Sequence, residues 1–139
     1  MGRSYWFECA KCGYRAIVAG RADQGLDLVI QTILCRDCKQ LYDAVTRLSV
    51  VDDSSGLGGV GGLPAARFQK RRQITTPPAF QAALNRLPPS GARRLKWHAF
   101  KLQCPVSGLH RVRSWNDPDR CPKCGIFLEK SALPYRLWD

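Results

Sequence analysis

The chain has 139 residues and a formal net charge of +11, and 45% of its residues are hydrophobic. This apolar content excludes a wholly disordered chain, and the length indicates one domain or two very small ones. No run approaches the roughly 20 apolar residues of a membrane helix, so we expect no membrane association. The first residues lack the apolar segment of a signal peptide, which predicts a cytoplasmic protein with reduced thiols.

The positive charge comes from the middle of the chain. Residues 54–116 contain no acidic residue and eleven basic ones. Both flanks are balanced, with seven basic and seven acidic residues in 1–53 and four of each in 117–139. Basic side chains that neutralise phosphates release counterions, so this segment indicates nucleic acid or a nucleoprotein complex as a partner.

The cysteine count indicates metal binding. There are seven cysteines, and an odd number fits a fully paired disulfide framework badly. Six of them form three C-x-x-C pairs, and Cys104 is left over. The pairs are Cys9/Cys12, Cys35/Cys38 and Cys121/Cys124.

The N-terminal part, 1–51, predicts a small β module. Residues 5–19 indicate a strand, a C-x-x-C turn and a second strand, with Gly13 where a tight turn needs positive φ. Asp27 to Leu34 is β-branched and apolar and predicts a strand, and 41–51 predicts a further strand or a short helix. Four thiolates on two such turns can close a tetrahedron around Zn²⁺. We therefore expect this module to use the ligands Cys9, Cys12, Cys35 and Cys38.

A redox-active dithiol is the alternative for these pairs. A thioredoxin-type pair opens a helix within a βαβ unit, and neither N-terminal pair has that sequence context. The metal site is therefore the favoured interpretation.

Residues 52–64 have the composition of a Gly-rich linker. They contain the G-x-G-x-x-G pattern of dinucleotide-binding loops, at Gly56, Gly58 and Gly61. That fold needs an acidic residue about 20 positions further on, and no acid follows before Asp117. A flexible linker is therefore the better interpretation.

Residues 65–92 form a basic segment in which one short helix is expected. Thr76 is a candidate N-cap, Pro77 and Pro78 suit the first turn, and the helix would run through Leu87. Residues 93–103 then alternate in polarity and predict a strand that leads into Cys104.

The C-terminal part, 93–139, predicts a second metal module. Ser107 stands where the frame of the other C-x-x-C turns would place a cysteine, and neutral serine is a poor zinc ligand. His110 is the natural replacement, and His98 is a reserve candidate on the predicted strand. We expect the ligands Cys104, His110, Cys121 and Cys124.

The two modules resemble zinc ribbons of the rubredoxin-like class, on the turns Cys9–Gly13 and Cys121–Gly125. The layout is also similar to uncharacterised bacterial proteins with a zinc ribbon at each end. The resemblance implies a small metal-stabilised β protein of two β-hairpin modules with a basic, partly helical connecting segment, and two structural Zn²⁺ per chain. Lys39 departs from the glycine usual after the second cysteine. A single compact fold that mixes ligands from both ends stays open.

The expected function is non-catalytic zinc binding combined with nucleic-acid binding. Aromatic residues interleave with the basic ones and can stack on bases; Phe68, Phe80, Trp97, Phe100 and Trp115 do so unless they pack a core. The candidate nucleic-acid contacts are Arg67, Lys70, Arg71, Arg72, Arg93, Arg94, Lys96, Lys101, Arg111 and Arg113.

Three other functions compete with this one. A structural adaptor would bind an acidic protein partner, with an apolar tail as anchor. A rubredoxin-like electron carrier would need iron at the four-cysteine site. A zinc deaminase would need a glutamate where Phe100 stands beside His98, so an enzyme is not expected. The tail residues are Leu133, Tyr135, Leu137 and Trp138.

Overall fold

The computed structural model describes residues 1–51, 76–87 and 95–139. The predicted linker 52–64, its glycine motif and most of the predicted basic segment 65–92 lie outside the described residues. The described part is mostly β-structure with one short helix. A small β protein is therefore confirmed, whereas the basic helical connector stays a prediction.

The N-terminal half builds hairpins around its cysteine pairs. Strands β1 (Gly2–Glu8) and β2 (Arg15–Val18) are antiparallel and enclose the first C-x-x-C turn. Strands β4 (Leu28–Cys35) and β5 (Gln40–Val51) are antiparallel and enclose the second. Both strand–turn–strand predictions are confirmed, and β5 is a strand because it pairs with β4 from Gln40 to Leu48.

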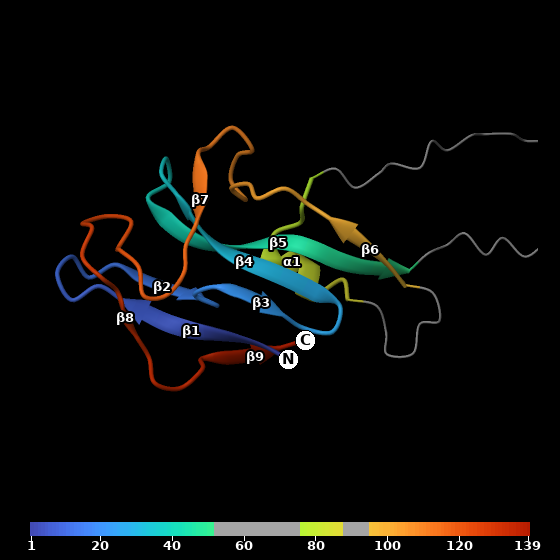
Figure 1. Cartoon of the computed structure of the whole chain (residues 1–139), viewed down its shortest axis with the longest axis horizontal. Helices are drawn as coiled ribbons and strands as arrows, with labels where there is room; N and C mark the ends of the chain where they lie inside the picture. The colour runs from blue at the N-terminus through green and yellow to red at the C-terminus, as the bar shows by residue number, and fades with distance from the viewer. Residues whose placement is uncertain (52–75, 88–94) are drawn as a thin grey trace, which may run out of the picture.

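Two sheets form, and each takes strands from both ends of the chain (Figure 1). In the first, β2, β1 and β8 (Glu129–Lys130) are neighbours, and β9 (Arg136–Trp138) also pairs with β1. In the second, the order is β3 (Ala22–Gln24), β4, β5 and β6 (Leu95–Ala99). Strand β7 (Val112–Ser114) pairs with β4 in that sheet. The C-terminal strands thus complete sheets that the N-terminal strands begin.

Two groups of buried side chains form the core. The first surrounds Phe7 and Trp115, whose rings meet edge to face at 5.2 Å, and it includes the thiols of Cys9 and Cys121. The second is built on β4 and β5 and is closed by Ala83 and Trp138. Residues 1–51 and the segments after 76 therefore share both groups.

The helix is shorter than its sequence pattern predicts. Helix α1 spans Phe80–Leu84, and the residue before it is Ala79, without a side-chain capping bond. Ala79 has an extended backbone and forms a bridge with Ala44 of β5. The chain therefore enters the helix from a sheet contact, and the predicted cap at Thr76 is wrong.

In the tail, residues 131–139, Trp138 is the buried side chain. Trp138 is 5% exposed and meets the Phe80 ring at 5.2 Å, while Leu133, Tyr135 and Leu137 are exposed. Strand β9 pairs with β1 at Gly2, and a Cβ at residue 2 would collide with the Trp138 ring. Glycine at this position therefore makes room for the tryptophan.

Candidate metal centres

All eight predicted metal donors converge, in two groups of four. The donor atoms within each group lie within 4.8 Å of one another. We call the first group the all-cysteine centre and the second the histidine centre. The all-cysteine centre consists of Cys9, Cys12, Cys121 and Cys124, and the histidine centre consists of Cys35, Cys38, Cys104 and His110.

The partition of donors differs from the sequence prediction. We expected Cys9/Cys12 to share a metal with Cys35/Cys38, and that pairing is wrong. The sheets supply the reason. Strand β8 lies beside β1 and carries the Cys121–Cys124 turn to the first hairpin, whereas β7 lies beside β4 and carries His110 to the second.

Backbone geometry at the all-cysteine centre is the same on both turns. Gly13 and Gly125 each have positive φ, +72° and +81°, and each donates its N–H to the carbonyl of the first cysteine of its turn at 3.0 Å. The first thiol of each turn accepts a backbone N–H, from Cys12 at 3.5 Å and from Lys123 at 3.4 Å. These bonds orient the first thiol of each turn, and at Cys9 the Cys12 N–H also stabilises the thiolate form.

The histidine centre combines one standard turn with one altered loop. Lys39 holds the positive φ, +53°, that glycine holds in the other turns. In the loop from Cys104 to His110, the carbonyl of Ser107 accepts the His110 N–H at 3.2 Å, and its hydroxyl accepts the Leu109 N–H at 3.3 Å. Ser107 therefore shapes the loop that presents the imidazole, and the reserve candidate His98 is not part of the group.

The distances between donors fit a tetrahedral metal. A Zn–S bond of ~2.3 Å and a Zn–N bond of ~2.0 Å imply S···S near ~3.8 Å and S···N near ~3.6 Å. In the all-cysteine centre, Cys12 Sγ lies 3.7 Å from Cys121 Sγ, and Cys9 Sγ lies 3.3 Å from Cys124 Sγ. These separations are far longer than a disulfide bond of ~2.05 Å.

In the histidine centre, Cys38 Sγ lies 3.7 Å from Cys104 Sγ and 3.3 Å from His110 Nδ1. Cys35 Sγ lies 3.7 Å from the same nitrogen. Nδ1 is therefore the nitrogen that faces the sulfurs of Cys35 and Cys38. All seven cysteines are unpaired.

The thiols in each centre differ strongly in acidity. The backbone N–H of Cys12 lowers the pKa of Cys9 to about 6. Although the Tyr14 backbone acts in the opposite direction, burial and the neighbouring thiols raise the pKa of Cys12 to about 12. Burial and the Cys35 thiol raise the pKa of Cys38 to about 11, while burial of Cys104 is outweighed by backbone N–H bonds from Ser107 and Val106, which bring its pKa to about 7. Thiolates this close together repel one another, and a bound cation would offset that repulsion.

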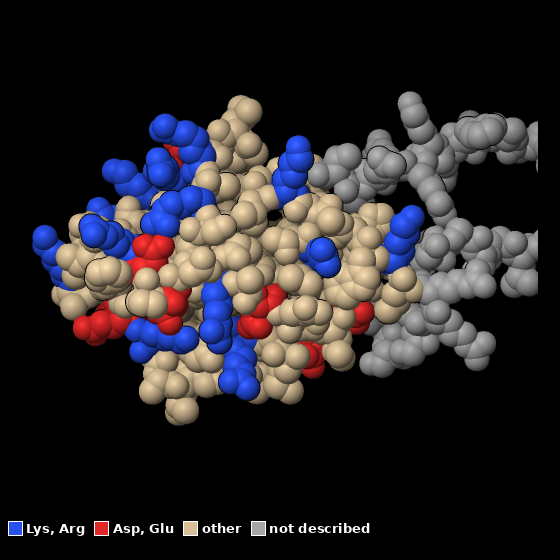
Figure 2. All heavy atoms as spheres, in the orientation of Figure 1, with Lys and Arg blue, Asp and Glu red and all other residues tan. Residues whose placement is uncertain are grey.

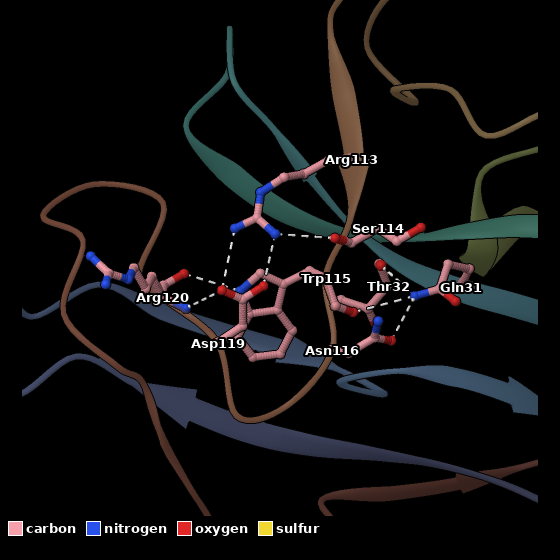
Figure 3. A network of polar contacts seen from close by, with 8 residues as sticks. All are labelled: Gln31, Thr32, Arg113, Ser114, Trp115, Asn116, Asp119 and Arg120. Carbon is pink, nitrogen blue, oxygen red and sulfur yellow. Dashed lines mark hydrogen bonds and ion pairs between the residues drawn. The ribbon is translucent and has the colours of Figure 1, made fainter.

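A network of hydrogen bonds holds in place the segment that runs from the histidine centre to the all-cysteine centre (Figure 3). The guanidinium of Arg113 donates to both carboxylate oxygens of Asp119, at 2.8 and 3.3 Å, and Trp115 Nε1 donates to the carbonyl of Arg120 at 3.0 Å. On the other side, the Gln31 amide on β4 donates to the carbonyl of Trp115 at 3.3 Å. The network fixes the path from His110 to Cys121, so one segment serves both centres.

The predicted nucleic-acid contacts divide into three classes. Lys96, Lys101 and Arg111 are exposed. Arg113 pairs with Asp119, which raises its pKa, so its charge is locally neutralised. The others lie outside the described residues, and their role stays a prediction: Arg67, Lys70, Arg71, Arg72, Arg93 and Arg94.

The predicted stacking aromatics are mostly withdrawn from solvent. Trp115 is 0% exposed, so it belongs to the core and cannot stack on a base. Phe80 and Phe100 pack against the second core group, while Trp97 on β6 is 44% exposed. Phe68 lies outside the described residues.

Two basic residues of the β4–β5 turn were not among the predicted nucleic-acid contacts. Arg36 and Lys39 are exposed on the Cys35–Cys38 turn, and the Arg36 N–H donates to the carbonyl of Arg111 at 2.9 Å. They were overlooked because 1–53 has balanced charge. Only the pairing of β7 with β4 places them beside Arg111.

Comparison of the chain with protein-family models, curated proteins and solved structures finds no match among them. Among the described residues, the helix is too short and not apolar enough to cross a membrane. The two donor groups are consistent with zinc-ribbon-like modules. This interpretation rests on the geometry of the donors alone.

Proposed function

We propose that the protein binds two structural zinc ions and that its metal-stabilised surface binds nucleic acid. The observation that supports zinc is the convergence of four donors in each centre, at separations that suit tetrahedral coordination. Zinc sites of this kind contribute directly to folding free energy.

The proposed role is non-catalytic. Catalytic zinc sites keep a coordination position open for water or substrate, and structural sites are closed by four protein ligands. Each centre here offers four protein donors. Zinc, when bound, supplies charge neutralisation and a fixed geometry for the two hairpins.

Metal content is the first test. Protein purified from a host with zinc and iron in the medium should contain two zinc per chain by elemental analysis, and chelation should abolish the folded circular-dichroism signal. A red protein with iron in the all-cysteine centre would instead support an electron carrier. Unchanged protease resistance after chelation would rule out a structural role for the metals.

Nucleic-acid binding is supported by the charge of the chain. The net charge is +11, and the acid-free segment 54–116 carries eleven basic residues. Binding that depends on phosphate contacts weakens steeply with salt. Titration of labelled RNA and DNA at increasing salt should give a strong negative slope, and binding without a salt slope would contradict the proposal.

A second candidate function is adaptor binding to an acidic protein. The exposed tail residues Leu133, Tyr135 and Leu137 support it, since Trp138 alone is used in the protein's own core. Purification of the native protein with and without nuclease distinguishes the two functions. A protein partner that survives nuclease treatment would favour the adaptor.

A further inference from the structure

A basic surface surrounds the histidine centre and is built from both ends of the chain. Arg36 and Lys39 lie on the turn between β4 and β5, and Arg111 follows the metal donor His110. All three are exposed. Figure 2 shows Lys and Arg side chains gathering, with little acidic surface, at the end of the molecule where Figure 1 places β7 and the β4–β5 turn.

Hydrogen bonds hold the turn that carries Arg36 and Lys39 against the segment that carries Arg111. The Arg36 N–H donates to the Arg111 carbonyl at 2.9 Å, and the Arg111 N–H donates to the Asp37 carboxylate at 2.7 Å. Both segments also supply donors to the same centre. The fold and the metal donors therefore fix the backbones from which the three side chains extend.

The charge of this surface stays available. Asp37 is the one acid in the turn; its carboxylate accepts the Arg111 N–H, so one negative charge stands beside three positive ones and the surface stays net positive. Within residues 1–51, 76–87 and 95–139, the side chains of Arg36, Lys39 and Arg111 form no ion pair. Arg113, two residues on, differs because its guanidinium pairs with Asp119.

We propose that Arg36, Lys39 and Arg111 form a preorganised site for the phosphate backbone of a nucleic acid, assembled beside the histidine centre. The inference rests on the proposed nucleic-acid binding and names where part of it occurs. Two exposed cations on the β4–β5 turn and one on the adjacent segment contact phosphates with a smaller loss of backbone entropy than a flexible arm would have to bear. Arg113 is excluded from this site.

The test compares two triple variants of the full, zinc-loaded chain that remove the same charge. The site variant is R36Q/K39N/R111Q, in which asparagine tolerates positive φ at residue 39. The control variant is R3Q/R21Q/R47Q, at exposed positions on β1, before β3 and on β5. Both must retain two metals per chain and the wild-type unfolding temperature. Labelled single-stranded and duplex RNA and DNA oligonucleotides are titrated over a range of salt.

The site variant should bind single strands about 100-fold more weakly near 0.1 M salt, with a log–log salt slope smaller by about 2. The control should keep the wild-type slope. An equal loss in both variants would overturn the site while leaving nucleic-acid binding intact. Wild-type protein that binds none of the four oligonucleotides would refute both the proposed function and this inference. Comparison of the four oligonucleotides shows which kind of backbone the site prefers.

Discussion

Lys39 shows how a single residue can depart from a turn pattern and still preserve it. Its φ of +53° lies in the left-handed region that Gly13 and Gly125 occupy in the other two turns. The left-handed conformation costs a non-glycine residue roughly 1–2 kcal/mol of conformational free energy. The Cys35–Cys38 turn therefore retains its geometry at some cost in stability.

Lys39→Gly should raise the free energy of unfolding by about 0.5–1 kcal/mol, since relief of backbone strain exceeds the added chain entropy of glycine. Urea denaturation of the zinc-loaded protein measures it. Gly13→Ala is the matched control and should lower stability, because alanine is strained at the φ of +72° found at residue 13. An added Cβ would meet no other atom within 4 Å, so backbone strain is the only effect expected. A destabilised Lys39→Gly protein would show that the lysine side chain has a structural role.

Asp43 is a buried carboxyl group in the β5 strand. It is 8% exposed and accepts hydrogen bonds from the Ala19 N–H at 3.0 Å and the Thr32 hydroxyl at 2.7 Å. Burial raises its pKa to about 6, even though these hydrogen bonds act in the opposite direction. The folded protein therefore holds this proton more tightly than the unfolded chain does.

A raised pKa contributes stability that is full below about pH 4 and is lost as pH rises through about 6. Between about pH 5 and pH 7, wild-type protein should lose about 1 kcal/mol of stability relative to Asp43→Asn. Denaturation curves of both proteins at each pH measure the difference, and proton competition at the metal donors cancels. A difference that is constant with pH would contradict the shifted pKa.

At the scale of elements, β9 fastens the end of the chain to its beginning. Strand β9 pairs with β1, and Trp138 fills the space above Gly2 and beside Phe80. Its neighbour Leu137 is 54% exposed. One residue of the strand thus provides the apolar contact.

Trp138→Ala should cost about 3–5 kcal/mol, because it leaves a cavity in the second core group. Leu137→Ala, in the same strand, should change stability by no more than about 0.5 kcal/mol. Thermal unfolding of both variants measures the contrast. Equal effects would mean that β9 contributes through backbone pairing rather than through the tryptophan.

Local patterns predict these elements unevenly. Strand β4 and the hairpin around Gly13 are predictable because alternation, turn glycines and cysteine spacing agree. The start of α1 is not, because the bridge of Ala79 to Ala44 is a tertiary contact. Strands β8 and β9 are too short for an alternating hydrophobic pattern to be recognised in the sequence.

For the whole molecule, the identity of the metal donors is predictable and their grouping is not. The C-x-x-C spacing and the serine at position 107 predict from local sequence all eight residues of the two candidate metal centres. Their partners depend on which strands are neighbours, and β1 with β8 and β4 with β7 are pairings between the two ends. The expectation that each end holds its own metal therefore fails.

Paired substitutions test the crossed arrangement by metal stoichiometry. Cys9→Ser with Cys121→Ser damages one centre, so the double variant should keep one zinc per chain. Cys9→Ser with Cys35→Ser damages both centres and should retain none. Elemental analysis of the two purified variants measures this, and donors grouped within each end would give the opposite result.

The crossed donors also have a consequence for the order in which the chain is made. A chain emerging from the ribosome presents Cys9, Cys12, Cys35 and Cys38 long before His110 and Cys124 exist. During that interval these four thiols are the only cysteines present, and they are the set that local spacing would group around one ion. A metal ion held early by these four thiols would have to lose two of them as ligands before either crossed group could form around it. If these four thiols bind an ion first, the C-terminal strands have to separate the two N-terminal turns to complete the crossed groups.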